Sequence, residues 1–193
     1  MSYFNTFSRE VFCKIVYCGP GLSGKTTNVE ILHQRAPPAA RGKLVSLKTE
    51  SDRTLFFDFL PIDLGEIRGY RVRLQLYTVP GQVFYRASRR LILRGADAIV
   101  FVADSQSARI DANVEAMSDL RENLGELCTP LESLPCVVQY NKRDLDGIEP
   151  LEVLRAQLNP MGAPEVESVA SSGLGVLETL KVVARLALRR LAA

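Results

Sequence analysis

Residues 19–26, GPGLSGKT, match the phosphate-binding pattern G-x-x-x-x-G-K-[ST] at every required position. An apolar stretch at residues 12–18 precedes them and favours a strand, and a helical pattern follows from Lys25 to about Arg35. This order directs backbone N–H groups and the positive end of a helix at an anion. A glycine-rich turn without a ligand is the alternative, and this context argues against it. The motif therefore predicts a phosphate-binding domain built around a parallel sheet.

Each residue type in this loop has a physical reason to be there. Glycines let the backbone amides turn inward around phosphate oxygens. We expect the Lys25 ammonium to neutralise the terminal phosphates of a nucleotide, and the Thr26 hydroxyl to bind Mg²⁺. The residues expected to contact the nucleotide are Gly19, Gly21, Leu22, Ser23, Gly24, Lys25, Thr26 and Thr27.

The rest of the chain alternates between strand and helix patterns. The runs AIVFVA at 98–103 and CVVQY at 136–140 are apolar throughout, which is typical of buried parallel strands. The patterns also predict strands at 55–60, 70–77 and 166–170, a strand or loop at 43–49, a turn at 63–69, and helices at 107–124, 150–158 and 175–191. We therefore expect a mostly parallel sheet covered on both faces, with ligands at the carboxyl ends of its strands.

Composition narrows the class of protein. The 193 residues are 47% hydrophobic with a formal net charge of +2, which suits one domain over residues 1–193. So small a charge gives no argument for nucleic acid. No apolar run is long enough to span a bilayer, the N-terminus lacks the apolar core of a signal peptide, and the C-terminus, ALRRLAA, lacks a cysteine for a prenyl anchor. We expect a cytoplasmic protein with no transmembrane or prenyl anchor.

The segment Asn141-Lys142-Arg143-Asp144 indicates which base is bound. The Asp144 carboxylate can accept two hydrogen bonds, from N1–H and the exocyclic amine of guanine, and adenine cannot supply that pair. We expect Asn141 to hold the neighbouring loops and the Lys142 stem to lie over the ring. NKRD alone is also a common surface turn. Its position after a buried strand, well downstream of the phosphate loop, favours guanine recognition.

The segment YTVPGQ at residues 77–82 is typical of a loop that senses the last phosphate. A loop that ends in Gly81-Gln82, downstream of a phosphate-binding signature, looks like the part of a nucleotide hydrolase that also aligns a water. Thr78 stands where many such loops carry an Asp that orients Mg²⁺ through a water, and a hydroxyl brings no negative charge. Asp52 and Asp58 are both candidates to compensate.

Together, these motifs resemble the bacterial MglA family of Ras-like small GTPases, which act in gliding motility and cell polarity. The resemblance runs from about Arg9 to about Arg185 and is carried by PGLSGKTTN, TESDRTLFFDFLP, GEIRG, YTVPGQVFY, FVADSQ, QYNKRDL and SGLGVLETLKVV. It implies the three-layer α/β fold of Ras-like P-loop GTPases, with a mostly parallel sheet of six strands or slightly more and helices on both faces.

The resemblance also implies roles for particular residues. In this family SDRT is the switch I segment, so Thr54 would meet Mg²⁺ and the last phosphate. Arg53 would supply, from the same chain, a guanidinium that stabilises charge in the transition state. Near the guanine O6 the usual Ser-Ala-Lys becomes Val169-Ala170-Ser171. We expect the Ala170 N–H at O6 and weaker stacking beside Ser171.

What the resemblance implies about function is a switch that binds GTP or GDP with Mg²⁺ and hydrolyses GTP slowly. A roadblock/LC7 (MglB-like) homodimer would stimulate hydrolysis, and effectors of polarity or motility would bind at the cell pole or at inner-membrane complexes. Two alternatives are a GTP-binding scaffold with little hydrolysis, because of Thr78, and a P-loop kinase. The NKRD loop and Gln82 argue against the kinase.

Two further patterns in the sequence do not belong to the nucleotide-binding motifs. Lys181, Arg185 and Arg189 recur at helical spacing and form a basic stripe, which we interpret as a solvated face, with a lipid or protein docking site as the alternative. Strand alternation at residues 55–60 predicts that Phe57 and Phe59 share one buried face.

Overall fold

The computed structural model describes the backbone of residues 3–5, 8–48, 54–80 and 86–191, and the side chains of residues 8–46, 57–80 and 89–191. Its strands are β1 (Tyr3–Asn5), β2 (Glu10–Cys18), β3 (Val45–Lys48), β4 (Thr54–Ile67), β5 (Tyr70–Thr78), β6 (Ala98–Asp104), β7 (Cys136–Asn141) and β8 (Glu165–Glu167). Its helices are α1 (Lys25–Arg35), α2 (Arg86–Leu93), α3 (Ile110–Glu126), α4 (Leu151–Leu158) and α5 (Val176–Leu191), with short 3-10 turns at Ser107–Arg109 and Leu131–Ser133.

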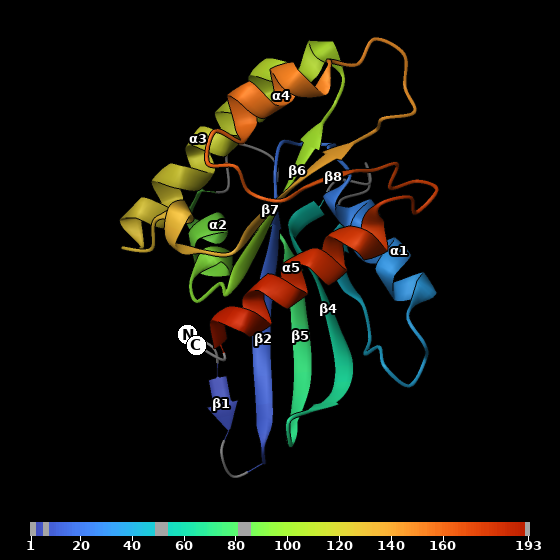
Figure 1. The fold of residues 1–193 in the computed structure, drawn as a ribbon, viewed down its shortest axis with the longest axis vertical. Coiled ribbons are helices and arrows are strands. Elements are labelled where there is room, and N and C mark those ends of the chain that lie inside the picture. Colours follow the sequence, from blue (N-terminus) through green and yellow to red (C-terminus); the bar gives the residue numbers. More distant parts are fainter. Residues whose placement is uncertain (1–2, 6–7, 49–53, 81–85, 192–193) are drawn as a thin grey trace.

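The strands form one eight-stranded sheet in the order β3-β4-β5-β2-β6-β7-β8, with β1 paired to β2 (Figure 1). Strands β5, β2, β6, β7 and β8 are parallel, whereas β3, β4 and β1 pair antiparallel. Strand β1 pairs with residues 10–12 of β2, and β6 pairs with residues 15–18. The predicted mostly parallel sheet is confirmed.

Helices cover both faces of the sheet, because its central strands are apolar on both sides. On one face, Ile15 and Tyr17 pack in a cluster with residues of α1 and α5, and Figure 1 shows α5 crossing this face. On the other face, Val16 and Phe101 pack in a cluster with residues of α2, α3 and α4. The sheet with helices on each of its faces forms the three-layer α/β architecture of Ras-like GTPases.

Three elements differ from the sequence prediction. Strand β1 and helix α2 were not expected, and β4 continues to Ile67 where we predicted a turn from residue 63. Asp63 accepts a hydrogen bond from the Gly65 amide at 2.8 Å, and the register shifts by a bulge between Asp63 and Glu66. Because a bulge absorbs the irregularity, the strand survives a sequence that is typical of a turn.

The predicted alternation of β4 is confirmed, since Phe57 and Phe59 share one face, but that face is not the more deeply buried of the two. Asp58 and Leu60 face the interior and are 1% and 0% exposed, while Phe57 and Phe59 are half-buried against the Tyr77 ring. The cause is the register with β5, which places Leu60 opposite Leu76 on the face that α1 and α5 cover. This register brings the carboxylate of Asp58 inside the protein.

Among the described residues, no helix is both long and apolar enough to cross a bilayer.

Candidate functional site

The predicted phosphate loop connects the end of β2 to the start of α1. Gly19 and Gly24 have φ angles of +136° and +99°, which favour glycine. A Cβ on Gly19 would lie 2.2 Å from the Val102 carbonyl oxygen, and one on Gly24 would lie 2.2 Å from Asn141 Nδ2. The loop is therefore wedged against the carboxyl ends of β6 and β7, at the edge of the sheet where the sequence placed the ligand.

Lys25 is buried in this loop with carbonyls as its hydrogen-bond partners. Its Nζ donates to the oxygens of Gly19 at 3.0 Å and Pro20 at 2.6 Å. Burial lowers the Lys25 pKa to about 8, although nearby Cys18 and Asp58 act in the opposite direction. A phosphate in the loop would supply the counter-charge that a buried ammonium requires.

The hydroxyl of Ser23 gives a second indication that this loop binds an anion. Its Oγ is buried, and it has no hydrogen-bond partner among the described atoms. Since buried polar atoms in proteins are nearly always hydrogen-bonded, an orphan hydroxyl beside a buried lysine fits a loop that closes around phosphate oxygens. The residues present therefore fit a bound nucleotide.

Asp58 joins Thr26, an expected Mg²⁺ ligand, to Thr78, which stands in place of the usual aspartate. Its Oδ2 accepts hydrogen bonds from the Thr26 hydroxyl at 2.7 Å and the Thr78 hydroxyl at 2.8 Å. Its Oδ1 accepts from the Ser46 hydroxyl, and its amide donates to Thr78 Oγ1 at 2.8 Å. Asp58 thus places a buried carboxylate beside Thr78, where the usual aspartate is missing. Asp52, the other candidate, lies outside the described residues.

Asn141 ties the base loop to its neighbours. Its Nδ2 donates to the Ser23 oxygen at 2.8 Å, which links it to the phosphate loop. Its Oδ1 accepts from the Ser168 hydroxyl at 3.0 Å and from the Ala170 amide at 2.9 Å. The Ala170 N–H, which we expected to face the guanine O6, is therefore engaged by Asn141 in this structure.

A buried carboxylate connects the same loops from the other side. Asp104 ends β6 and is 0% exposed, and its Oδ2 lies 2.6 Å from Lys142 Nζ. The same oxygen lies 3.9 Å from Arg109 Nε, and Arg109 Nη2 donates to the Gly21 oxygen at 2.9 Å. The Asn113 side chain holds the backbone of Asp104. Asn113 Oδ1 accepts from the Asp104 N–H, and Asn113 Nδ2 donates to the Asp104 carbonyl oxygen. Asp104 thereby couples the base loop to the phosphate loop.

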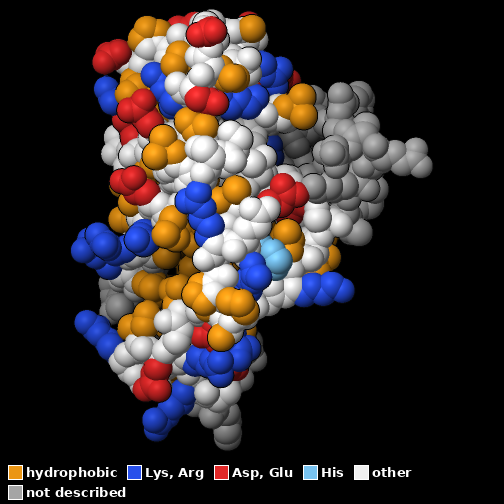
Figure 2. Space-filling model, turned by 90° about the vertical axis from the view of Figure 1, so that its right-hand side faces the viewer, with side chains coloured by type: hydrophobic (Ala, Val, Ile, Leu, Met, Phe, Trp, Pro, Cys, Tyr) orange, Lys and Arg blue, Asp and Glu red, His pale blue; other side chains and the backbone are white. Residues whose placement is uncertain are grey.

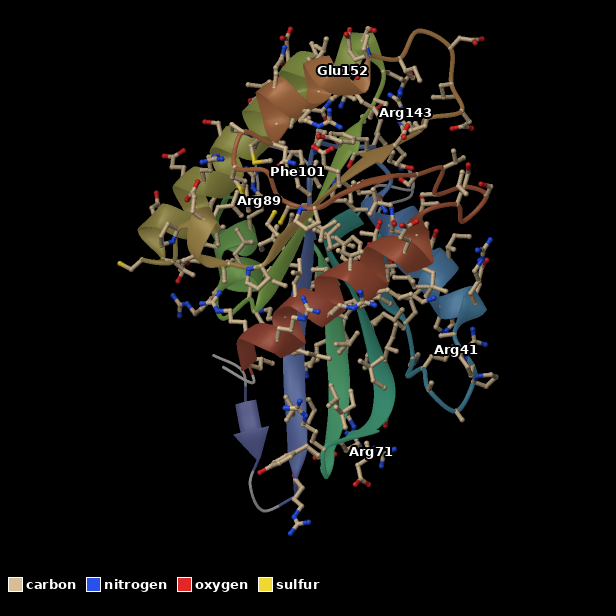
Figure 3. All side chains as sticks on the ribbon, in the orientation of Figure 1. Arg41, Arg71, Arg89, Phe101, Arg143 and Glu152 are labelled. Carbon is tan, nitrogen blue, oxygen red and sulfur yellow. The ribbon has the colours of Figure 1, made fainter. Side chains whose placement is uncertain are left out.

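The residue expected to read the base is exposed beside this network. Asp144 is exposed, and no described residue forms a hydrogen bond or an ion pair with its carboxylate. Next to it lies Arg143, which is labelled in Figure 3. Arg143 donates to the Glu149 carbonyl oxygen at 2.8 Å and to the Glu167 carboxylate at 3.1 Å. These bonds hold the loop while leaving the Asp144 carboxylate available to a ligand.

Comparison with known proteins decides which family this site belongs to. No family model matches the chain. The chain is 56% identical over 191 residues, covering 99% of its own length and 98% of the relative, to the Mutual gliding-motility protein MglA of Myxococcus xanthus (strain DK1622). The chain belongs to the MglA family of Ras-like small GTPases. Membership of the MglA family implies that the site binds a guanine nucleotide.

Not every residue that we assigned to the MglA-type site is described. Arg53, Gly81 and Gln82 lie outside the described residues, and Thr54 begins β4 with its side chain undescribed. The residues that the structure brings together at the carboxyl edge of the sheet are Gly19, Gly21, Leu22, Ser23, Gly24, Lys25, Thr26, Thr27, Asn141, Lys142, Asp144, Ala170 and Ser171.

Sequence reasoning missed two residues of the MglA-type site. Asp104 ends the buried run FVAD, and a charged residue at the carboxyl end of a buried parallel strand was a usable signal. Arg109 follows Ser107 in a 3-10 turn, and no motif marks it. Its contact with Gly21 depends on how the turn folds back over the phosphate loop.

We expect Arg109→Ala to accelerate GDP release by about tenfold, because it removes a charge-assisted hydrogen bond to the phosphate loop. Stopped-flow release of a fluorescent GDP analogue measures the rate. Arg121→Ala is the matched control, since Arg121 pairs with Glu132 on the surface and lies outside the site. An unchanged release rate in Arg109→Ala would contradict a role for Arg109 in positioning the loop.

Proposed function

We propose that this chain is a guanine-nucleotide switch that hydrolyses GTP to GDP and phosphate. Its output would be the binding of partner proteins that control cell polarity and gliding motility. The observation that carries the proposal is the hydrogen bond of Asn141 Nδ2 to the Ser23 oxygen, because it joins a phosphate-binding loop to a guanine-reading loop. The name of the relative from Myxococcus xanthus supports the link to gliding motility.

The nucleotide would be held at its two ends by different elements. The amides of residues 19–27, with Lys25, would bind the phosphates, and Asp144 would accept the two guanine hydrogen bonds. Asp104 holds Lys142 at 2.6 Å, and in this position the Lys142 stem would cover the base. Residues 1–193 would act as one G domain.

Mg²⁺, when bound, supplies positive charge to the phosphate oxygens. Thr26 and Thr54 would be its protein ligands. We infer that Asp58 supplies the negative charge that Thr78 lacks, since its Oδ2 accepts from both Thr26 and Thr78. Thr78 would then orient Asp58 instead of the metal-bound water.

This arrangement predicts the effect of removing the carboxylate. We expect Asp58→Asn to raise the Mg²⁺ concentration needed for half-maximal GTP binding by about tenfold or more, because the amide is neutral. Titration of Mg²⁺ against fluorescent GTP-analogue binding measures the shift.

The control for this change is Asp111→Asn, an exposed aspartate on α3. A second variant, Asp58→Asn with Thr78→Asp, moves the carboxylate across the 2.8 Å hydrogen bond to the usual position. We expect it to recover part of the Mg²⁺ affinity. If Asp58→Asn binds with an unchanged Mg²⁺ requirement, the carboxylate is not part of the metal site.

Hydrolysis is the attack of water on the γ-phosphate of GTP. Gln82 would orient this water, and Arg53 would stabilise the charge that develops on the transferred group. A roadblock/LC7 (MglB-like) homodimer would act by setting these two side chains, since the arginine is already in the chain. The protein would act in the cytoplasm, with recruitment to the cell pole or to inner-membrane complexes.

A GTP-binding scaffold with little hydrolysis is the second candidate, because Thr78 replaces the usual aspartate. Phosphate release from GTP, with and without a saturating roadblock-type homodimer, distinguishes the two. Acceleration by the homodimer supports the switch. The absence of acceleration, with GTP still bound, supports the scaffold.

A further inference from the structure

Two polar side chains contact each other inside the apolar core, beside the phosphate loop. Asn28 of α1 and Gln139 of β7 are both 0% exposed, whereas Figure 2 shows charged side chains spread over the surface of the molecule. Their side-chain amides form a reciprocal pair, since Asn28 Nδ2 donates to Gln139 Oε1 and Gln139 Nε2 donates to Asn28 Oδ1, each at 2.9 Å. Val29 and Val137, on the same two elements, belong to the apolar cluster on this face of the sheet. Neither amide residue belongs to the phosphate-loop pattern or to the NKRD segment.

The other hydrogens of the two amides reach two further parts of the chain. Gln139 Nε2 also donates to the Thr179 hydroxyl of α5 at 2.8 Å, and that hydroxyl donates to the Gly175 carbonyl oxygen at 2.8 Å. Asn28 Nδ2 also donates to the carbonyl oxygen of Gly24, in the phosphate loop, at 2.9 Å. Each NH₂ group therefore uses both of its hydrogens. Turning either amide around would set two acceptors against each other, so the network has one arrangement.

Stability of the core gives no reason for this network. Replacing both partners of a buried hydrogen bond by apolar groups of similar shape is nearly neutral or even stabilising. A buried amide that loses its partner costs free energy, so a polar pair also makes the core more sensitive to change. The Gly24 carbonyl is the one acceptor of this network that lies in the nucleotide site. A functional effect of the network would therefore act through this carbonyl.

The direction of the Gly24 carbonyl fixes the direction of an amide in the phosphate loop. The peptide between Gly24 and Lys25 is trans, so its C=O and N–H point in opposite directions. The carbonyl accepts from Asn28 Nδ2 at 2.9 Å and from the Asn28 backbone N–H at 3.0 Å, both from α1. Lys25 is the first residue of α1, so its N–H has no partner within the helix. This N–H therefore points out of the N-terminus of α1, where an anion is expected.

Strand β7 holds the preceding peptide in the same way. Asn141 lies two residues after Gln139, so the two side chains are on the same face of β7. Asn141 Nδ2 donates to the Ser23 carbonyl oxygen at 2.8 Å, which directs the Gly24 N–H to the opposite side of that peptide. Two successive amides of the phosphate loop, those of Gly24 and Lys25, are thereby oriented from one strand. The same strand leads into the NKRD loop.

We propose that Asn28 and Gln139 are positioning residues for nucleotide binding, which hold the Gly24–Lys25 peptide with its N–H toward the β-phosphate of GDP or GTP. This role rests on the proposed function, because it requires a nucleotide in the loop. Neither side chain touches the nucleotide, since both act through the Gly24 carbonyl. An amide that is already oriented binds phosphate without a further cost of ordering the loop. The effect of the network therefore falls on the β-phosphate and not on the base.

The test removes the amide pair as a unit, in the variant Asn28→Ala with Gln139→Leu, which keeps the total side-chain volume nearly constant. Competition with a fluorescent GDP analogue on the full chain measures the dissociation constants of GDP and of GMP, which lacks the β-phosphate. We expect GDP to bind about tenfold or more weakly, and GMP affinity to change by less than about threefold. A general loss of folding would lower both affinities by the same factor, so the ratio of the two separates positioning from stability.

Asn159→Ala is the matched control. Asn159 is 4% exposed, and its side chain donates to the Ala163 carbonyl oxygen and accepts from the Ala163 amide, each at 2.8 Å. The control therefore also loses buried amide hydrogen bonds, but at the end of α4 and away from the phosphate loop. We expect its ratio of GDP to GMP affinity to equal that of the wild type.

Two further variants keep the test decisive. Asn28→Gln with Gln139→Asn exchanges the two side chains and keeps an amide pair, so it should recover part of the GDP affinity that the apolar double variant loses. Gln139→Met alone removes the support of Asn28. It should shift the ratio in the same direction as the double variant, and it replaces that variant if the double variant does not fold.

Two results would overturn the proposal. One is an unchanged ratio of GDP to GMP affinity in the folded variants that lack the amide pair. The other is an equal change of this ratio in Asn159→Ala, which would assign the effect to lost core packing. In both cases the wild-type protein still binds GDP, and the proposed function stands. A wild-type protein that binds neither GDP nor GTP would instead refute the proposed function itself.

Discussion

Asp144→Asn is expected to weaken GDP binding by roughly 10²–10⁴-fold, since each of two hydrogen bonds to a charged acceptor contributes about 1.5–3 kcal/mol. The loop itself should persist, because Asn141 is anchored to Ser23 and Arg143 to Glu149 and Glu167. Asparagine keeps one acceptor and gains a donor. Guanine would then face an N–H where it requires an oxygen.

The same substitution predicts which ligand the variant prefers. Xanthine carries a carbonyl where guanine has its exocyclic amine, and the side-chain amide introduced by Asp144→Asn can donate to that carbonyl. Competition between GDP and XDP for a fluorescent nucleotide measures the preference, which should move toward XDP. Asp146→Asn, at an exposed position two residues away, is the control. Retained preference for GTP over ATP and XTP in Asp144→Asn would show that the base is read elsewhere.

Arg53→Ala is expected to lower partner-stimulated GTP hydrolysis by about 10³-fold or more, the effect typical of an arginine placed at the transferred phosphoryl group. GDP binding should change little, because such an arginine acts on charge that develops only in the transition state. Single-turnover phosphate release with a roadblock-type homodimer measures the loss.

Arg53→Lys separates charge from geometry. Lysine keeps the positive charge but lacks the planar fork of donors, so we expect it to recover only a small part of the rate. The complex with the homodimer must still form, which a pull-down of the GTP-loaded variants checks. Stimulated turnover at the wild-type rate in Arg53→Ala would refute the assigned role of Arg53.

The parts of the site that were predictable are those encoded in short contiguous segments. The phosphate loop lies between β2 and α1 as expected, because a strand, a glycine-rich turn and a helix follow one another directly in the sequence. The NKRD loop follows β7 for the same reason, and Asn141 does bridge neighbouring loops. Local order in the chain was enough to place both.

The contacts that were not predictable depend on how distant strands align. Asp58 became a buried partner of Thr26 and Thr78 because the register of β4 with β5 turned its side chain inward. A shift of one residue in the β4–β5 register would have turned Asp58 to the other face of the sheet. The phenylalanines around Asp58 had suggested that their own face was the buried one. Helix α2 begins at Arg86 beside the undescribed residues 81–85, and its sequence carries no capping signal.

Identification of the nucleotide that the protein retains through purification tests the central claim most directly. The protein is denatured and the released nucleotide is separated by ion-exchange chromatography and quantified against protein. We expect close to one guanine nucleotide per chain, mainly GDP, and none from Asp144→Asn. An adenine nucleotide, or a folded protein that neither retains nor rebinds GDP or GTP, would contradict it.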